Sequence, residues 1–461
     1  MKMRRFFSVF LLTALVVSLL CTPAALADDT APQLPEDPHI LAGAALLADP
    51  DTGAVAYALN EHQELYPASL TKIMTALLVL EAVDEGKLSL DQEVTASATA
   101  FEGLSSDGSS ANIKVGEIMT VRNLLYCMMV VSANEACNIL AEAVSGSVSA
   151  FVDRMNARAA ELECENTHFV NPNGLHDPQH YSSAWDLYLI TREAMKHDIF
   201  MVICDTANVV IPATNMSGER NYWTTNHLLS TWRVIGYLDK RAQGIKTGST
   251  DAAGHCLVSY AAQGSLSYIS VILGAERVVE NGVGNIRSFS ETSRLFDYGF
   301  DNFSYKTILR QSEPIKDVTV TLSKTDCVAV HPAEDIETLM PNGLAPEHLE
   351  RKVTLLSESV EAPVAAGQKL GTLELSYDGT VYGTVDLLAM NAVEASKPLI
   401  FWRDVQAFFA RRSVRIAIIV VIVLIVALVL WKLLFARRRY RYGRSVSRRS
   451  GGGYRGRRKR F

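Results

Sequence analysis

Ser69 and Lys72 have the residue types and the spacing of a nucleophile and its base. They lie three residues apart in a segment predicted to begin a helix, so both side chains project from one face and the lysine nitrogen can reach the serine oxygen. Lysine accepts a proton only when it is neutral, and its ordinary pKa of about 10.4 leaves very little neutral amine near pH 7. Lowering that pKa by roughly 3 units needs about 4 kcal/mol, which burial and a second nearby cation could supply.

A Ser-x-x-Lys pair alone carries little information, because about one or two are expected by chance in a chain of 461 residues. Two further elements follow it along the chain, Ser-Ala-Asn at 132–134 and Lys-Thr-Gly at 246–248. Together, in this order, the three elements match the motif set of penicillin-binding proteins and class A β-lactamases.

The hydrophobic pattern predicts the elements that would carry these residues. Pro67 and apolar residues at 73, 77 and 80 favour a helix that begins beside Ser69. A second helical stretch over 121–144 is interrupted at 132–134. Periodicity predicts three other elements, namely a β-hairpin over 40–59, strands over 244–274 and a helix over 290–298. The first domain is therefore predicted to be α+β.

Beyond about residue 305 the pattern changes to short alternating β runs. Alternating residues on both sides of Asp378-Gly379 predict a hairpin within a small all-β domain. Because no motif with chemical content falls between 310 and 400, we interpret this domain as a spacer or interaction module.

Both ends of the chain carry targeting signals. Basic residues, an apolar run and Ala-Leu-Ala before Asp28 predict a signal peptide cleaved after Ala27. The 21 residues of 416–436 contain one charge, Lys432, and at ~1.5 Å per residue they cover about 30 Å, one hydrocarbon core. Twelve Arg and Lys residues follow, so the positive-inside rule predicts a single-pass protein with a cytoplasmic tail and an extracytoplasmic body.

Charge is distributed unevenly along the chain. The formal net charge is −6, but residues 28–400 hold 24 basic and 49 acidic side chains, a net of −25, while 437–461 hold 12 basic and no acidic ones. An acidic body argues against nucleic acid as a partner of the exported domain, and the basic tail is expected to contact anionic lipid of the cytoplasmic membrane.

The predicted order of segments is a signal peptide (1–27), a linker (28–37), a first domain (38–305), an all-β domain (306–397), a juxtamembrane segment (398–415), a transmembrane helix (416–436) and a basic tail (437–461). Six cysteines remain after removal of the signal peptide, and both free thiols and disulfides stay open for them. The ten histidines include no HExxH pair, so neither a metal nor another cofactor is expected.

The chain resembles the low-molecular-mass penicillin-binding proteins that act as serine D-alanyl-D-alanine carboxypeptidases. The resemblance is strong over about 38–305, and the all-β region to about 395 is similar to the family's second domain. It is carried by the following segments: 66–81, 130–147, 166–175, 181–187, 224–229, 244–257 and 293–300. It implies a β-lactamase/transpeptidase-like domain, with an antiparallel sheet flanked by helices, and a substrate that is the peptidoglycan stem peptide ending in D-Ala-D-Ala. It also implies covalent inhibition by β-lactam antibiotics.

The resemblance also implies roles for individual residues. Ser69 would attack the carbonyl of the penultimate D-Ala, and Lys72 would accept its proton. Ser132 would relay a proton to the leaving amine, while Asn134 would hold the peptide and orient Lys72.

The strand motif would serve the other end of the substrate. Lys246 would supply positive potential and help to lower the pKa of Lys72, Thr247 would bind the terminal carboxylate, and Gly248 would leave room for substrate. Backbone N–H groups of Ser69 and Ser249 would form the oxyanion hole. An arginine near the carboxylate is implied as well, with Arg277 and Arg287 both open.

Three alternatives remain at this stage. A β-lactamase shares the acylation residues but needs a glutamate-positioned water to release the drug, and 132–246 lacks that signature. A D,D-endopeptidase could use the same residues on cross-linked peptides. A non-catalytic wall-binding protein would be expected to have lost a catalytic side chain, and none of the six in the three motifs is missing.

Overall fold

The structure is a computed structural model that describes residues 32–105, 108–280 and 283–436. The predicted signal peptide and basic tail lie outside the described residues. The contacts of the chain divide it into two compact units, of which the first contains the candidate functional residues.

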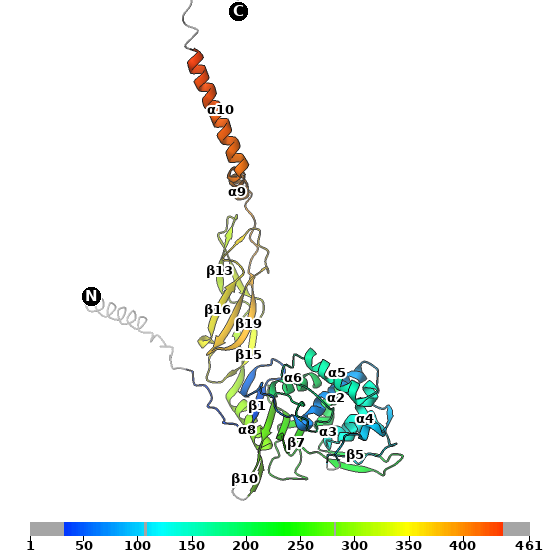
Figure 1. The fold of residues 1–461 in the computed structure, drawn as a ribbon. Helices are drawn as coiled ribbons and strands as arrows, with labels where there is room; N and C mark the ends of the chain where they lie inside the picture. Colours follow the sequence, from blue (N-terminus) through cyan, green and yellow to red (C-terminus); the bar gives the residue numbers. More distant parts are fainter. Residues whose placement is uncertain (1–31, 106–107, 281–282, 437–461) are drawn as a thin grey trace, which may run out of the picture. The chain divides into compact units, whose positions relative to one another are not determined.

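The first unit is built on a five-stranded antiparallel sheet in the order β2-β1-β9-β8-β7 (Figure 1). Its strands are β1 (Ala44–Ala48), β2 (Val55–Leu59), β7 (Ala242–Thr250), β8 (Gly254–Gln263) and β9 (Leu266–Ala275). The predicted hairpin over 40–59 is thus present as β1 and β2, and the strands over 244–274 as β7 to β9. β7 lies at an edge of the sheet, where one of its sides is open to a ligand.

Helices cover both faces of this sheet, because alternate residues of the central strands are apolar on each side. Leu46 packs with the helical cluster built around α2, whereas Leu47 packs with Phe296 of α8 on the other face. The helical elements are η1 (Ala68–Thr71), α2 (Lys72–Asp84), α3 (Val121–Val130), α4 (Asn134–Ser145), α5 (Val148–Glu161), α6 (Ala184–Ala194), α7 (Asp198–Cys204) and α8 (Arg287–Asn302). The predicted α+β class with a helix-flanked antiparallel sheet is confirmed.

The break predicted inside 121–144 is the junction of α3 and α4. Ser132 takes φ +66, a left-handed conformation that ends α3, and Asn134 begins α4. Residues 93–286 also form three short two-stranded sheets: β3 (Glu93–Thr95) with β4 (Ile118–Thr120), β5 (Asn208–Ile211) with β6 (Arg220–Trp223), and β10 (Arg277–Glu280) with β11 (Val283–Ile286).

Between α8 and about residue 395 the chain is almost entirely β, as predicted. β12 (Phe303–Leu309) pairs with β15 (Ile336–Pro341). A six-stranded sheet has the order β16-β18-β19-β14-β13-β17, formed by β13 (Lys316–Thr321), β14 (Cys327–Pro332), β16 (Glu350–Leu355), β17 (Ser359–Glu361), β18 (Lys369–Tyr377) and β19 (Thr380–Ala389). Asp378 and Gly379 join β18 to β19 with φ +47 and +80, the left-handed pair that a tight hairpin requires.

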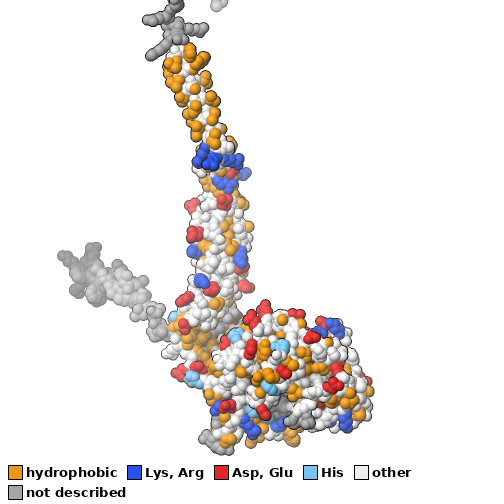
Figure 2. All heavy atoms as spheres, viewed as in Figure 1, with side chains coloured by type: hydrophobic (Ala, Val, Ile, Leu, Met, Phe, Trp, Pro, Cys, Tyr) orange, Lys and Arg blue, Asp and Glu red, His pale blue; other side chains and the backbone are white. Residues whose placement is uncertain are grey.

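The chain continues as two helices, α9 (Lys397–Ala410) and α10 (Arg412–Ala436). Residues Arg412–Phe435 form a helix long and apolar enough to cross a membrane. Figure 2 shows apolar side chains covering α10, with Lys and Arg side chains gathered at its beginning. The predicted C-terminal apolar helix is therefore present.

All six cysteines of the described chain are free thiols. Five of them are buried, and Cys327 is exposed. The structure thus favours thiols over bridges for these six residues.

Candidate active site

Ser69 lies in the 3₁₀ turn η1, and Lys72 is the first residue of α2. Ala68, just before the serine, takes φ +48, an uncommon backbone conformation for a residue with a side chain. Thr71, the last residue of the same turn, stabilises it, because its hydroxyl donates to the Ala68 carbonyl at 2.8 Å. The same hydroxyl lies 2.7 Å from Nε2 of buried His180.

His180 is held in one tautomer by its second partner. Its Nδ1 accepts the Val170 N–H at 3.1 Å, so the ring hydrogen sits on Nε2 and is donated to Thr71. Burial lowers the pKa of His180 to about 4, which keeps the ring neutral near pH 7.

Lys72 is completely buried, and its ammonium meets three oxygen atoms. Nζ lies 2.9 Å from Ser69 Oγ, 2.8 Å from Asn134 Oδ1 and 2.5 Å from the Asn173 carbonyl. Burial lowers the pKa of Lys72. When the amine is neutral, the two fixed acceptors can take its two hydrogens, which leaves the lone pair facing the serine hydroxyl.

Lys246 is the second buried amine of the site. Its pKa is lowered to about 7, first by burial and then by the positive charge of Lys72. Like charges destabilise each other reciprocally, so the lowering of the Lys72 pKa by Lys246 stays a prediction. Its Nζ donates to the Thr247 carbonyl at 3.0 Å.

Ser132 and Asn134 reach the site from the junction of α3 and α4. Asn134 accepts the 2.8 Å hydrogen bond of the Lys72 amine with its Oδ1. Ser132 is buried, and its Oγ has no hydrogen-bond partner within the described chain. A buried hydroxyl without a partner normally costs free energy, so this atom is suited to bond a ligand that enters the site.

The 246–249 segment of β7 runs beside the serine turn. Thr247 Oγ1 lies 2.6 Å from Thr225 Oγ1. A Cβ added to Gly248 would lie 2.9 Å from the Pro67 carbonyl and 3.3 Å from Ser69 N. A side chain at 248 would therefore press on the serine turn, a restriction beyond the predicted need for substrate space.

A loop absent from the predicted catalytic set closes the other side of the serine turn. The Asn173 carbonyl of this loop accepts from the Lys72 amine, and the Pro172 carbonyl accepts a 2.6 Å hydrogen bond from the Thr75 hydroxyl. Gly174 takes φ +83, and a Cβ there would lie 1.9 Å from the Ala68 carbonyl oxygen. The Asn-Pro-Asn-Gly run at 171–174 was noticed only as part of the resemblance; its turn-forming composition is the signal that could have singled it out.

These elements surround a cavity of about 540 Å³. Ser69, Asn134 and Ser249 line it directly, whereas Lys72 and Lys246 are buried. Its other lining residues are Ser105, Gly108, Ser109, Asn173, Gly174, Leu175, His176, Thr250, Asp251 and Ala252.

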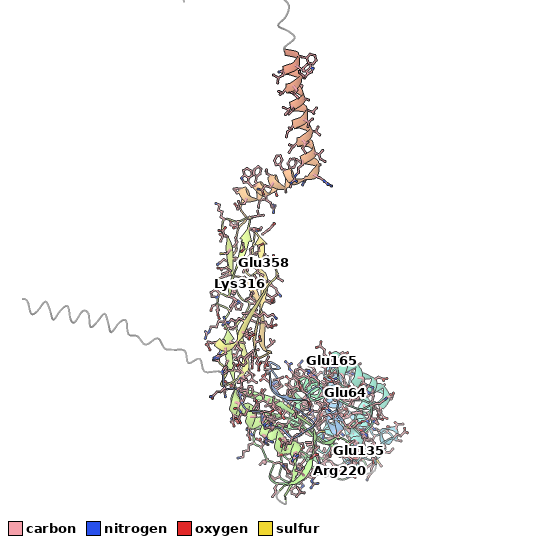
Figure 3. All side chains as sticks on the ribbon, turned by 60° about the vertical axis from the view of Figure 1, so that its left-hand side comes forward. Glu64, Glu135, Glu165, Arg220, Lys316 and Glu358 are labelled. Atoms are coloured by element: carbon pink, nitrogen blue, oxygen red, sulfur yellow. The ribbon has the colours of Figure 1, made fainter. Side chains whose placement is uncertain are left out.

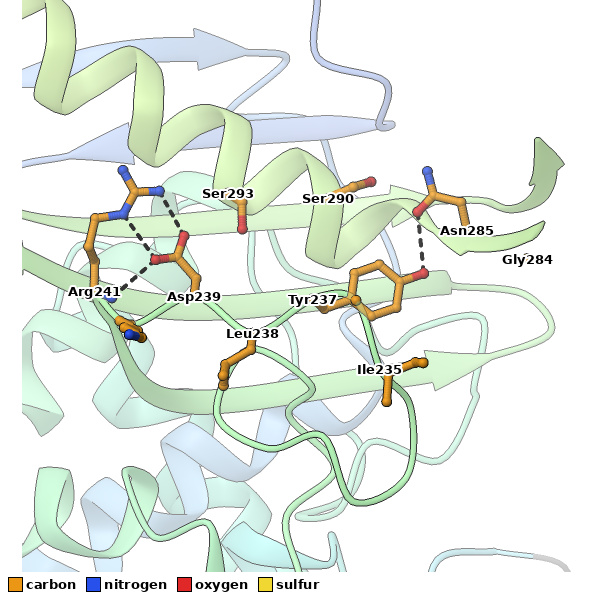
Figure 4. Close-up of a pocket in the computed structure, with 11 residues that line it drawn as sticks. Ile235, Tyr237, Leu238, Asp239, Arg241, Gly284, Asn285, Ser290 and Ser293 are labelled. Atoms are coloured by element: carbon orange, nitrogen blue, oxygen red, sulfur yellow. Dashed lines mark hydrogen bonds and ion pairs between the residues drawn. The ribbon is translucent and has the colours of Figure 1, made fainter. Parts of the chain in front are cut away.

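A larger cavity of about 810 Å³ lies elsewhere, between the segment before β7, the β10–β11 hairpin and α8 (Figure 4). Tyr237 bonds Asn285 there, and Asp239 forms a double hydrogen bond with Arg241. None of the predicted site residues lines it. Size alone therefore does not identify the site.

The two candidate arginines differ in their surroundings. Arg287 lies 3.6 Å from Glu276. The charge of Arg277 contributes to lowering the pKa of His255, and His255 is the cross-strand neighbour of Ser249. Of the two arginines, Arg277 is thus the one whose charge acts near Ser249, towards the end of β7. Within the described ranges, no group of three or more His, Cys, Asp or Glu side chains could hold a metal ion.

Comparison with known proteins agrees with this arrangement. Residues 31–277 match the D-alanyl-D-alanine carboxypeptidase family, peptidase S11, and residues 303–395 match the C-terminal domain of penicillin-binding protein 5. D-alanyl-D-alanine carboxypeptidase DacF of Bacillus subtilis is 31% identical over 379 residues, which cover 82% of this chain and 92% of that protein. Penicillin-binding protein 5 of Haemophilus influenzae has a similar structure, with a TM-score of 0.62 and 29% identity over 78% of this chain and 99% of that one.

The chain therefore belongs to the D-alanyl-D-alanine carboxypeptidase family. This is a family of serine hydrolases that act on D-Ala-D-Ala peptides of peptidoglycan through an acyl-enzyme and bind β-lactams. A D-alanyl-D-alanine endopeptidase of Pseudomonas aeruginosa is also similar, at 31% identity over 227 residues that cover 49% of this chain and 68% of that protein.

Proposed function

We propose that this protein removes the terminal D-alanine of peptidoglycan stem peptides through an acyl-enzyme on Ser69. The observation that carries the proposal is the 2.9 Å contact between Ser69 Oγ and a completely buried Lys72 amine of lowered pKa. In the neutral form, Lys72 accepts the hydroxyl proton as the oxygen attacks the penultimate D-Ala carbonyl.

The remaining motif residues serve the later steps. Ser132, whose Oγ has no partner within the described chain, delivers a proton to the leaving amine. Thr247 binds the terminal carboxylate, and the N–H groups of Ser69 and Ser249 stabilise the oxyanion, a contribution on the order of 3 kcal/mol per donor. Terminal D-alanine leaves, and water hydrolyses the acyl-enzyme.

The test measures D-alanine release from a peptide ending in D-Ala-D-Ala, with intact-mass detection of a penicillin adduct. Wild-type protein is expected to release D-alanine and to gain one penicillin mass on Ser69, whereas Ser69→Ala should do neither. Unchanged release by Ser69→Ala would refute the assignment of the nucleophile. An intact, folded wild-type chain that forms no adduct would favour the non-catalytic alternative.

The same assay separates the enzymatic alternatives. A long-lived penicillin adduct is expected for a carboxypeptidase, and rapid drug turnover would indicate a β-lactamase. Similarity to the Pseudomonas endopeptidase makes cleavage of cross-linked peptides a second candidate activity of the same site. Product analysis on cross-linked muropeptides tests it.

We further propose that α10 spans the cytoplasmic membrane, with the body outside and the tail inside. The length and apolar surface of α10 and the twelve basic residues after it support this topology. Exposed Phe401, Trp402, Phe408 and Phe409 on the preceding α9 suit the membrane–water interface. Protease treatment of intact spheroplasts should remove the body and spare the tail; loss of a C-terminal tag would refute this orientation.

A further inference from the structure

The loop before β4 forms one wall of the candidate site, and it rests on Asn134 and its neighbour. Ser105, Gly108 and Ser109 line the cavity with Ser69. The Asn134 N–H donates to the Ser109 carbonyl at 2.9 Å. A Cβ on Gly108 would lie 2.9 Å from Asn134 Nδ2, so the amide that bonds Lys72 sits directly against this loop.

Glu135, the next residue of α4, has a buried side chain turned towards the same loop. Its Oε1 accepts from Ser110 Oγ at 2.7 Å, from Ala111 N at 2.8 Å and from Ile113 N at 3.4 Å. Figure 3 places it in the catalytic unit, where the first turn of α4 favours an acidic side chain. Tyr222 holds the other backbone polar group of the same residue, because its hydroxyl donates to the Ala111 carbonyl at 2.5 Å.

We propose that Glu135 is a positioning residue for the reaction, whose carboxylate fixes the 109–113 loop against Asn134 and whose negative charge lies one residue from the amide that bonds Lys72. The proposal rests on the proposed function of Ser69 and Lys72. No motif residue has this double role, because Asn134 touches the amine but carries no charge.

The charges around Lys72 show why Glu135 matters electrostatically. Cys137 on α4 would raise the pKa of Lys72 as a thiolate, but its own pKa is raised to about 11 by burial, so it is uncharged near pH 7. His180 is neutral near pH 7 as well. Lys246 on β7 has a pKa of about 7 and is an anion in neither of its protonation states. Glu135 is therefore the anion that acts on Lys72 among the described groups, and it opposes the effect of burial.

All three hydrogen bonds go to Oε1 of Glu135. Substitution can therefore separate the effect of these bonds on the loop from the effect of the negative charge. Glu135→Gln can keep Oε1 as the acceptor and removes only the charge, whereas Glu135→Ala removes both. Tyr222→Phe is the matched control, because it deletes a hydrogen bond to the same residue, Ala111, without changing charge. All variants are made in the full-length chain in detergent, and folding is checked by thermal melting.

The measured quantity is the rate of Ser69 acylation by a fluorescent penicillin from pH 5 to 10, together with kcat and KM for D-alanine release. Loss of the negative charge lowers the pKa of Lys72, so the acidic limb of Glu135→Gln should move to lower pH. Below the limb, its rate should exceed that of wild type by about threefold or more, which corresponds to half a pKa unit. Tyr222→Phe should leave the limb in place.

Glu135→Ala should lose about tenfold or more in kcat/KM at every pH, with much of the loss in KM, because one wall of the site is released. Superimposable pH profiles for Glu135→Gln and wild type would overturn the electrostatic role. If Glu135→Ala fails to fold, the Glu135→Gln profile decides the proposal. Absence of a Ser69 adduct in wild type would instead refute the proposed function, a distinct outcome.

Discussion

Replacing Gly174 by alanine tests whether the 171–175 loop determines where the nucleophile lies. Gly174 has φ +83, and its new Cβ would lie 1.9 Å from the Ala68 carbonyl oxygen. Observed Cβ contacts essentially never fall below 3.0 Å, so the two backbones must separate by at least 1.1 Å. Because a misplacement of about 1 Å can cost on the order of 10²-fold in rate, we expect acylation of Ser69 to slow by about that factor, or about 2.7 kcal/mol.

Gly146 provides the matched control. It ends α4 with φ +79, and a Cβ there would meet nothing within 4 Å. Both alanine variants carry the left-handed strain of about 1–2 kcal/mol, so both should melt at a lower temperature, but Gly146→Ala should acylate at the wild-type rate. The acylation rate of Gly248→Ala should fall between those of the other two variants. Its Cβ would lie 2.9 Å from the Pro67 carbonyl and needs to move only slightly.

The assay is the second-order rate of fluorescent-penicillin labelling, compared with the melting temperature of each full-length variant in detergent. A Gly174→Ala protein that acylates within about threefold of Gly146→Ala would refute the idea that this loop positions the serine. Equal loss of rate in both variants would point to general destabilisation instead.

Other predictions concern charge, pH and packing. Lys246→Gln should move the acidic limb of acylation to higher pH, because removing a neighbouring cation raises the pKa of Lys72; a limb moved to lower pH would contradict the mutual repulsion. The pKa of His180 is depressed from 6.5 to about 4, so its contribution to stability is complete above pH 6.5 and is lost as the pH falls towards 4. Over that range, the free energy of unfolding of wild type, measured in urea, should fall by about 3 kcal/mol more than that of His180→Asn. Equal losses would argue against a neutral His180. Gly299→Ala should destabilise the first unit by about 1–3 kcal/mol, because its Cβ would lie 2.7 Å from Leu47 Cδ2; an unchanged melting temperature would show that α8 can shift freely.

Local pattern was enough to predict the hairpin at β1 and β2, the α3–α4 break and the apolar helix α10. In each case, the signal comes from residues next to one another, such as alternation around a turn or an uninterrupted apolar run. The exact form of the serine turn was less predictable. Ser69 lies in a 3₁₀ turn rather than an α-helix, and an added Cβ at Gly174 or Gly248 would clash with the backbone of 67–69, two close approaches that no local pattern reveals.

The motif residues, their order and the family resemblance can be read from the amino-acid sequence, since these depend on residue type and spacing. So can the division of charge between an acidic body and a basic tail. The lowered pKa values of the two lysines, in contrast, depend on how the chain folds. Lys72, Asn173 and Lys246 are far apart along the chain, and burial of the two amines is a property of their packing rather than of any local pattern. The same holds for Glu135, an ordinary helix residue in the sequence, whose carboxylate acquires a partner loop and acts on Lys72 only once the chain has folded.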